Sequence, residues 1–165
     1  MSLREIRRWP DPVLAKVCAP VEDVAAVRTL VDDMFDTMYA APGRGLAAPQ
    51  VGVLLRVFVM DVGWKEGAKT PLACINPRIV TASESLHTGD EGCLSIPGVM
   101  APVTRPDSVR LAYTDMDGTA QVVDLEGFAA TCAQHEMDHL DGIVTFDRLD
   151  AAARAALLAE YEAQA

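Results

Sequence analysis

His135-Glu136-Met137-Asp138-His139 has the pattern H-E-x-x-H, and the architecture that we expect is built around it. Two histidines four positions apart lie one above the other on a helix face, so both imidazoles can bind one metal ion. Glu136 lies about 100° around the helix from His135, so its carboxylate stands beside the ion and can accept a proton without becoming a ligand. Cys132 and Leu140 share this face, which indicates that the helix points inward. The stretch therefore predicts an internal metal-binding helix.

Gly127 and Gly142 bracket this helix, which we expect from about Phe128 to Leu140. Apolar residues at helical spacing predict a second helix over residues 24–39, with Asp23 as its N-cap and Pro42-Gly43 after its end. A last helix is expected over about 150–163, capped by Asp150. Runs typical of strands occupy residues 55–62, 72–80, 109–114, 121–125 and 143–146.

Two features refine the strands. Asp117-Gly118 is a hairpin signal between two of them, and Pro77 marks an edge or a bend in another. Because the strands come first and the central helix follows, the order favours an α+β fold with mixed or antiparallel sheets around the H-E-x-x-H helix. The 165 residues fit one catalytic domain that spans 1–165.

Charge and hydrophobicity indicate which partners and which cellular compartment to expect. The formal net charge of −10 disfavours DNA, RNA and anionic membrane surfaces. The N-terminus lacks the apolar run of a secretory signal, and no segment approaches the ~20 apolar residues of a membrane span. We therefore expect a cytoplasmic protein without membrane partners, whose cysteines are thiols. These are Cys18, Cys74, Cys93 and Cys132.

A catalytic metal site of this kind usually has a third protein ligand. In the metzincin pattern Gly142 is in place, but Thr145 stands where the third histidine should be. Glu160 or Glu162 would suit a thermolysin-like site, yet both lie in the last turns of the terminal helix, where fraying is common. Cys93 is the remaining candidate, because a thiolate with two imidazoles suits Zn²⁺ or Fe²⁺. A small buried hydrophobic residue is the alternative interpretation of any one cysteine.

Three segments in register resemble the peptide deformylases: Gly43-Arg44-Gly45-Leu46-Ala47-Ala48-Pro49-Gln50, Glu91-Gly92-Cys93-Leu94-Ser95 and Gln134-His135-Glu136-Met137-Asp138-His139. Looser similarity runs from about Trp9 to Asp147. The resemblance implies hydrolysis of the N-formyl group from N-formylmethionyl peptides of newly made proteins, with release of formate. It also implies one divalent metal ion per chain, Fe²⁺ by preference, with Zn²⁺, Ni²⁺ or Co²⁺ possible.

The resemblance also implies roles for individual residues. Cys93, His135 and His139 would bind the metal, and Glu136 would transfer the proton. The side-chain amide of Gln50 and the backbone N–H of Leu94 would stabilise the oxyanion, and Glu91 would orient a metal-bound histidine. The residues implied to bind substrate are Arg44, Gly45, Gly92, Phe128 and Thr131.

Some residues depart from the family pattern. Arg44, Gly89, Phe128 and Thr131 stand where aliphatic residues are common, and Met100 where arginine is frequent. These departures motivate an alternative function: a deformylase-like paralogue that hydrolyses another N-acyl amine or formylated substrate. The terminal helix carries Arg154 against two glutamates, so we do not expect it to dock on ribosomal RNA.

Overall fold

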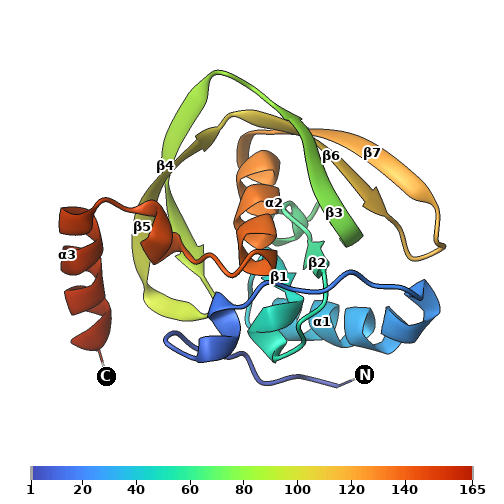
Figure 1. Ribbon diagram of the computed structural model, residues 1–165, viewed down its shortest axis with the longest axis horizontal. Coiled ribbons are helices and arrows are strands. Elements are labelled where there is room, and N and C mark those ends of the chain that lie inside the picture. The colour runs from blue at the N-terminus through green and yellow to red at the C-terminus, as the bar shows by residue number, and fades with distance from the viewer. Residues whose placement is uncertain (1, 165) are drawn as a thin grey trace.

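The computed structural model describes residues 2–164, and its two antiparallel sheets surround one central helix (Figure 1). A five-stranded sheet has the order β1-β2-β3-β6-β7, and β4 and β5 form a separate pair. The bounds of the helices and strands are α1 Arg28–Ala40, β1 Gly45–Ala47, β2 Val57–Met60, β3 Leu72–Ala82, β4 Leu86–Cys93, β5 Ile96–Pro106, β6 Ser108–Thr114, β7 Ala120–Glu126, α2 Gly127–Leu140 and α3 Ala151–Glu162. The expected α+β class is confirmed.

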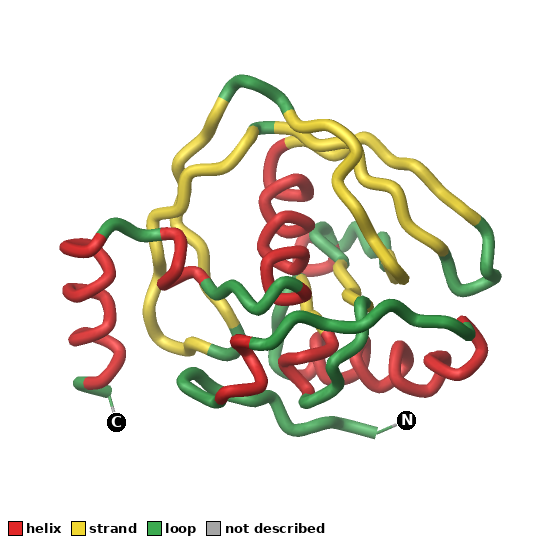
Figure 2. The backbone as a smooth tube through the Cα atoms, in the orientation of Figure 1, coloured by secondary structure: helices red, strands yellow, loops and turns green. Residues whose placement is uncertain are grey.

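Helix α2 carries the H-E-x-x-H stretch and stands between the β4–β5 pair and the larger sheet (Figure 2). It contacts β1, β2, β6 and β7 of the larger sheet and β5 of the pair. Every residue from Cys132 to Leu140 is buried. Both histidines are therefore held inside the molecule, as the sequence predicts.

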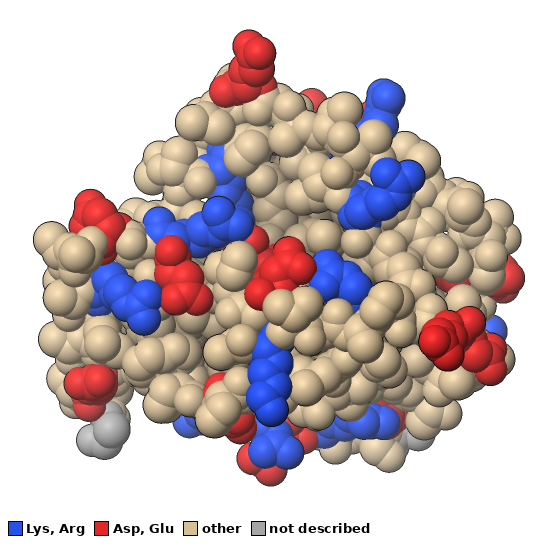
Figure 3. Space-filling view, in the orientation of Figure 1, with Lys and Arg blue, Asp and Glu red and all other residues tan. Residues whose placement is uncertain are grey.

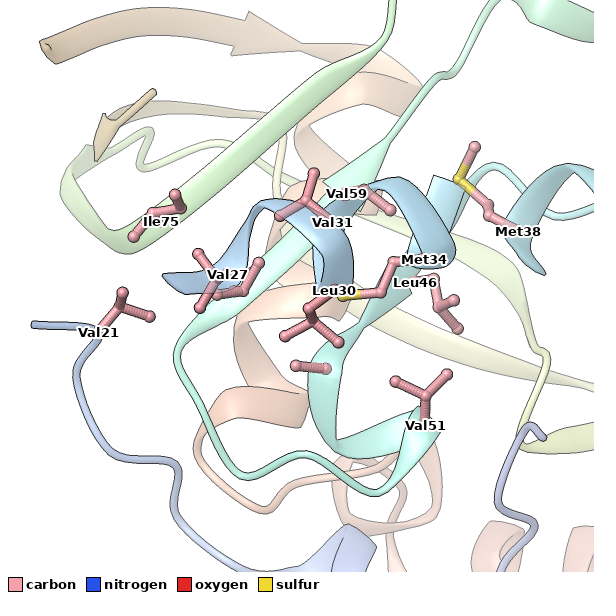
Figure 4. Packing of buried hydrophobic residues seen from close by; sticks show 12 residues of the cluster. Val21, Val27, Leu30, Val31, Met34, Met38, Leu46, Val51, Val59 and Ile75 are labelled. Atoms are coloured by element: carbon pink, nitrogen blue, oxygen red, sulfur yellow. The ribbon is translucent and has the colours of Figure 1, made fainter. Parts of the chain in front are cut away.

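The main core lies between α1 and the start of the five-stranded sheet (Figure 4). Leu30 and Met34 of α1 pack against Leu46 of β1 and Val59 of β2. Burying such side chains contributes about 1.5–3 kcal/mol each, which fixes β1 in place. β1 is an edge strand that also contacts α2, so this packing positions the strand against the central helix.

Two sequence expectations need correction. The helix expected over 24–39 begins later, because Asp23 caps a 3₁₀ turn at Val24–Val27 and α1 starts at Arg28. The strand expected over 143–146 is wrong, because a 3₁₀ turn occupies Thr145–Arg148. There the Val144 N–H donates to Asp147 Oδ2 at 3.0 Å, and Phe146 is fully buried in a side-chain cluster, so the apolar run packs without strand pairing.

Within the sheets, the hairpin between β6 and β7 is confirmed. Pro77 was expected to mark an edge or a bend. It lies at a shift in register between Ile75 and Arg78, which agrees with a bend in the strand. The edge alternative is wrong, because β3 pairs with both β2 and β6. The long hairpin of β4 and β5 was missed by sequence reasoning. Most of β4 is exposed, and the buried face of β5 includes the weak strand signals Ala101 and Arg105.

Three further expectations concern surface and chemistry. All four cysteines are free. Among residues 2–164, no helix is both long and apolar enough to span a bilayer. On the face drawn in Figure 3, Lys and Arg side chains lie interspersed with Asp and Glu, so this face offers no continuous basic surface.

Candidate active site

Three metal-ligating side chains converge where the end of β4 meets α2. The thiol of Cys93 and one ring nitrogen each of His135 and His139 lie within 4.8 Å of one another. Cys93 Sγ is 3.4 Å from His139 Nε2. Sulfur and nitrogen donors that share one tetrahedral ion would be about 3.5 Å apart, given usual metal–ligand bond lengths. The donor set and its spacing therefore fit a single divalent ion.

Cys93 reaches this position because of the turn that follows it. Cys93 pairs with Ile96 across the β4–β5 hairpin, so Leu94 and Ser95 form a tight connection. Gln50 ties this turn to the segment after β1, because its Nε2 donates to Ser95 Oγ at 3.0 Å and lies 3.6 Å from Cys93 Sγ. The Ala47 N–H donates to Gln50 Oε1 at 2.9 Å, which fixes the orientation of the amide. Its NH₂ group therefore faces the thiol.

The histidines have different environments. His135 Nδ1 lies 3.0 Å from Glu91 Oε1, so its other ring nitrogen can bind an ion. For His139, burial is the main factor that lowers the pKa well below its ordinary value, and the positive charge of Arg105 lowers it further. The His139 ring therefore stays neutral, which is the form that binds metal.

A buried ion network supports Glu91, and sequence reasoning missed most of it. Arg105 donates to both Glu91 oxygens, at 2.7 and 3.0 Å, and to Asp138 Oδ2 at 2.9 Å. Arg148 holds the other Asp138 oxygen at 2.6 Å. Burial alone would raise the pKa of Glu91, but the hydrogen bonds with His135 and Arg105 outweigh it and keep that pKa low. Two features of the sequence could have indicated this network. They are the aspartate inside H-E-x-x-H and the position of Arg105 among the alternate residues of β5 that face inward.

Glu136 is buried beside the ligands. Its Oε1 has no hydrogen-bond partner among the residues that the structure describes, and burial is the main factor that raises its pKa to about 7. Gly45 of β1 approaches it closely. A Cβ at residue 45 would lie 2.5 Å from Glu136 Oε2 and 2.8 Å from Cys132 Sγ. Only glycine leaves the carboxylate room here.

One open cleft contains nearly all the predicted site residues. Gly43 and Leu94 meet at one end, because a Cβ at residue 43 would lie 2.7 Å from Leu94 Cδ1. His139, 1% exposed, lies below the cleft surface, and Gly89 does not contribute to the lining. The predicted residues that line the cleft are Arg44, Gly45, Gln50, Glu91, Gly92, Cys93, Leu94, Phe128, Thr131, His135 and Glu136.

A thiol and two imidazoles around one point, with a buried carboxylate beside them and an open cleft above, define a mononuclear metallohydrolase. Comparison with known proteins narrows this class. The polypeptide deformylase family matches residues 3–155, and the chain belongs to this family.

Individual relatives agree over nearly the whole length. A peptide deformylase of Rhodopseudomonas palustris (strain BisB18) is 48% identical over 165 residues, which cover 98% of this chain and 94% of the relative. A peptide deformylase of Rhizobium meliloti (strain 1021) is 48% identical over 148 residues, or 89% and 85% of the two chains. The crystal structure of peptide deformylase from Thermus thermophilus has a TM-score of 0.91 at 41% identity and covers 99% of this chain and 95% of that one.

Proposed function

We propose that this enzyme hydrolyses the N-formyl group from N-formylmethionyl peptides of newly made proteins and releases formate and a free N-terminus. The observation that carries the proposal is the convergence of Cys93, His135 and His139 beside Glu136 in one cleft. Relatives named peptide deformylase cover nearly the whole chain, so the paralogue with another N-acyl substrate is not favoured.

We propose Cys93, His135 and His139 as the ligands of one ion per chain, and Fe²⁺ as the native metal. A thiolate with two imidazoles accepts Fe²⁺, and also Zn²⁺, Ni²⁺ or Co²⁺. When bound, such an ion supplies Lewis acidity, which lowers the pKa of water and polarises a carbonyl oxygen. Glu91 orients His135 through the contact at Nδ1.

Glu136 transfers the proton in this scheme. Its carboxylate lies beside the ligands, and a pKa of about 7 suits a group that must both accept and donate near neutral pH. It takes the proton from the water that attacks the formyl carbon and delivers it to the amine that leaves. Gly45 keeps the space that this carboxylate occupies.

The negative charge that develops on the formyl oxygen needs donors that are already oriented. Gln50 supplies its side-chain NH₂, which the contact with Ala47 N aims toward Cys93. Leu94 supplies its backbone N–H from the turn between β4 and β5. Gln50 lies in the 3₁₀ turn after β1 and Leu94 in the turn between β4 and β5, and both residues line the cleft.

The free edge of β1 is the place for the peptide main chain. An extended peptide can add to an exposed strand edge, and Gly45 and Gly92 leave space for its backbone on the two sides of the cleft. Phe128 and Thr131 would line the space for the first side chain, and Arg44 lies beside that space, against the Phe128 ring.

The partner of the site is then a formylated peptide, and we place the reaction in the cytoplasm, where new chains emerge. We do not assign ribosome docking to α3. Its single basic residue, Arg154, already pairs with Asp147 at 3.0 Å.

The test is anaerobic purification with metal analysis, followed by turnover of formyl-Met, formyl-Ala and acetyl-Met peptides. We expect about one bound ion per chain, iron as the main metal, and the highest kcat/KM for formyl-Met. Glu136→Gln should retain the metal but lower kcat by about 10²–10⁴. Failure of metal-loaded protein to cleave any formyl peptide would reject the proposal, and faster cleavage of acetyl-Met would establish the paralogue.

A further inference from the structure

We propose that Arg44 makes this site select formyl peptides with an acidic side chain in one of the two residues after the formylated residue. The inference rests on the proposed deformylase function and goes beyond it. It concerns the Arg44 guanidinium, which lines the cleft and pairs with the exposed carboxylate of Glu66.

The position of Arg44 directs its side chain to the cleft mouth. The residue precedes Gly45 at the start of β1, and its guanidinium lies 5.3 Å from the centroid of the Phe128 ring, at the first turn of α2. The Arg44 backbone is fixed as well, because its carbonyl accepts from the Asp61 N–H at 2.9 Å. The side chain is 30% exposed, so it packs along the wall while remaining accessible to a ligand.

Glu66 satisfies only part of this guanidinium. Arg44 Nη2 donates to Glu66 Oε1 at 2.6 Å, whereas Arg44 Nε is buried, so a ligand can reach this guanidinium only through its two Nη groups. A guanidinium binds a carboxylate best through two parallel N–H groups. Glu66 is 63% exposed and can move aside, so a substrate carboxylate could bind the same guanidinium.

The charges at this part of the mouth favour an acidic ligand. Lys65 also lines the cleft, and its ammonium lies over the Trp64 ring, without a carboxylate within ion-pair distance in the described chain. Arg44 and Lys65 thus face one carboxylate, Glu66, and leave one positive charge in excess in a protein whose net charge is −10. The lining also includes Asp90 of β4 and, from the N-terminal segment, Arg4, Arg7 and Arg8 with Glu5 and Asp11, so Arg44 and Lys65 form one basic wall of the cleft.

Geometry places this wall beside the start of the peptide. If the substrate main chain lies along the free edge of β1 at Gly45, the next two residues extend about 7 Å further. Arg44 is the adjacent residue on that strand, so its side chain lies alongside this part of the peptide. The selected group is therefore a carboxylate close to the formylated residue, not a distant acidic segment.

The experiment compares matched peptides with the metal-loaded enzyme. The pairs are formyl-Met-Glu-Ala-amide with formyl-Met-Gln-Ala-amide, and formyl-Met-Ala-Glu-amide with formyl-Met-Ala-Gln-amide. We expect kcat/KM to be about two- to fivefold higher for the glutamate peptide in at least one pair, which is the range for a partly exposed ion pair. Raising the salt to about 0.5 M should remove most of the preference.

Variants assign the preference to Arg44. Arg44→Met should reduce the Glu/Gln ratio to one or below, whereas Glu66→Gln should raise it, because the competing carboxylate is removed. Arg110→Gln also removes a positive charge, from the exposed pair with Asp124 outside the cleft, and should leave the ratio unchanged.

The possible outcomes distinguish failure of the proposed preference for acidic peptides from failure of the deformylase function. Turnover of glutamine peptides with equal or poorer turnover of both glutamate peptides overturns the inference and leaves the deformylase function intact. A preference that survives Arg44→Met, or that Arg110→Gln removes equally, overturns it as well. Absence of turnover of every formyl peptide rejects the proposed function and the inference together.

Discussion

Replacing Glu91 with glutamine tests how the buried ion network controls the metal site. Glu91 is 7% exposed, receives two hydrogen bonds from Arg105 and lies 3.0 Å from His135 Nδ1. Glutamine keeps the shape and one oxygen acceptor but removes the charge. Its NH₂ group cannot accept from Arg105, so the buried guanidinium loses a charged partner.

The expected magnitude follows from burial. Breaking a buried ion pair lowers the free energy of unfolding by about 3–5 kcal/mol. Because glutamine retains one oxygen acceptor for Arg105, we expect Glu91→Gln to lie at the lower end, about 3 kcal/mol. For a domain of this size that lowers Tm by roughly 6–12 °C. Because Glu91 also orients His135, affinity for the metal should fall by about 10–100-fold.

The assay is a Zn²⁺ titration against a competing chelator, together with thermal unfolding of the metal-free protein. Asp124→Asn is the matched control, since it removes a carboxylate from the exposed pair with Arg110 and should change stability far less than Glu91→Gln. Unchanged Zn²⁺ affinity in Glu91→Gln would refute the orienting role. A stability loss no larger than that of Asp124→Asn would refute the energetic argument.

Two further substitutions and two measurements on the metal-loaded protein test the cleft and its ligands. Gly45→Ala should lower kcat by about 100-fold, because the new Cβ displaces the Glu136 carboxylate, and near-normal steady-state turnover would contradict this. Gln50→Ala should lower kcat by about 10²–10³ with little change in KM, and a pure KM effect would place Gln50 in ground-state binding instead. The Co²⁺-loaded protein should absorb through a sulfur-to-metal charge-transfer band, and a metal-replete sample without it excludes Cys93 as a ligand. Activity of the Fe²⁺ form should decay in air, as expected for a thiolate-ligated ferrous site, and an air-stable ferrous sample would count against that ligand set.

Local sequence patterns predicted the central helix well, because its determinants lie within one segment. Gly127 and Gly142 mark its ends, and the spacing of His135 and His139 depends only on helical geometry. The hairpin of β6 and β7 was equally accessible, since a turn signal and two alternating strands are adjacent in the chain.

Long-range contacts were not accessible in this way. The spacing of residues could not establish that Cys93 meets His139, because 46 positions separate them. Exclusion of other ligands left Cys93 as a candidate, and the resemblance supplied the full ligand set. The network of Arg105, Asp138 and Arg148 escaped notice because charged residues usually indicate a solvated surface. The apolar run at 143–146 misled because buried side chains in a 3₁₀ turn give the same pattern as a short buried strand.

The site depends on contacts between parts of the fold that have no strand pairing with one another. β1 belongs to the five-stranded sheet and β4 to the two-stranded pair, so backbone hydrogen bonds in the sheets cannot hold Gly45 opposite Cys93. Gln50 joins the segment after β1 to Ser95, and Arg105 of β5 joins the β4–β5 pair to α2 through Glu91 and Asp138. A metal ion would add a third link between β4 and α2 through Cys93 and the histidines. Metal binding should therefore stabilise the packing of β4 on α2 as well as support chemistry, because an ion that binds only the folded arrangement shifts the equilibrium toward it.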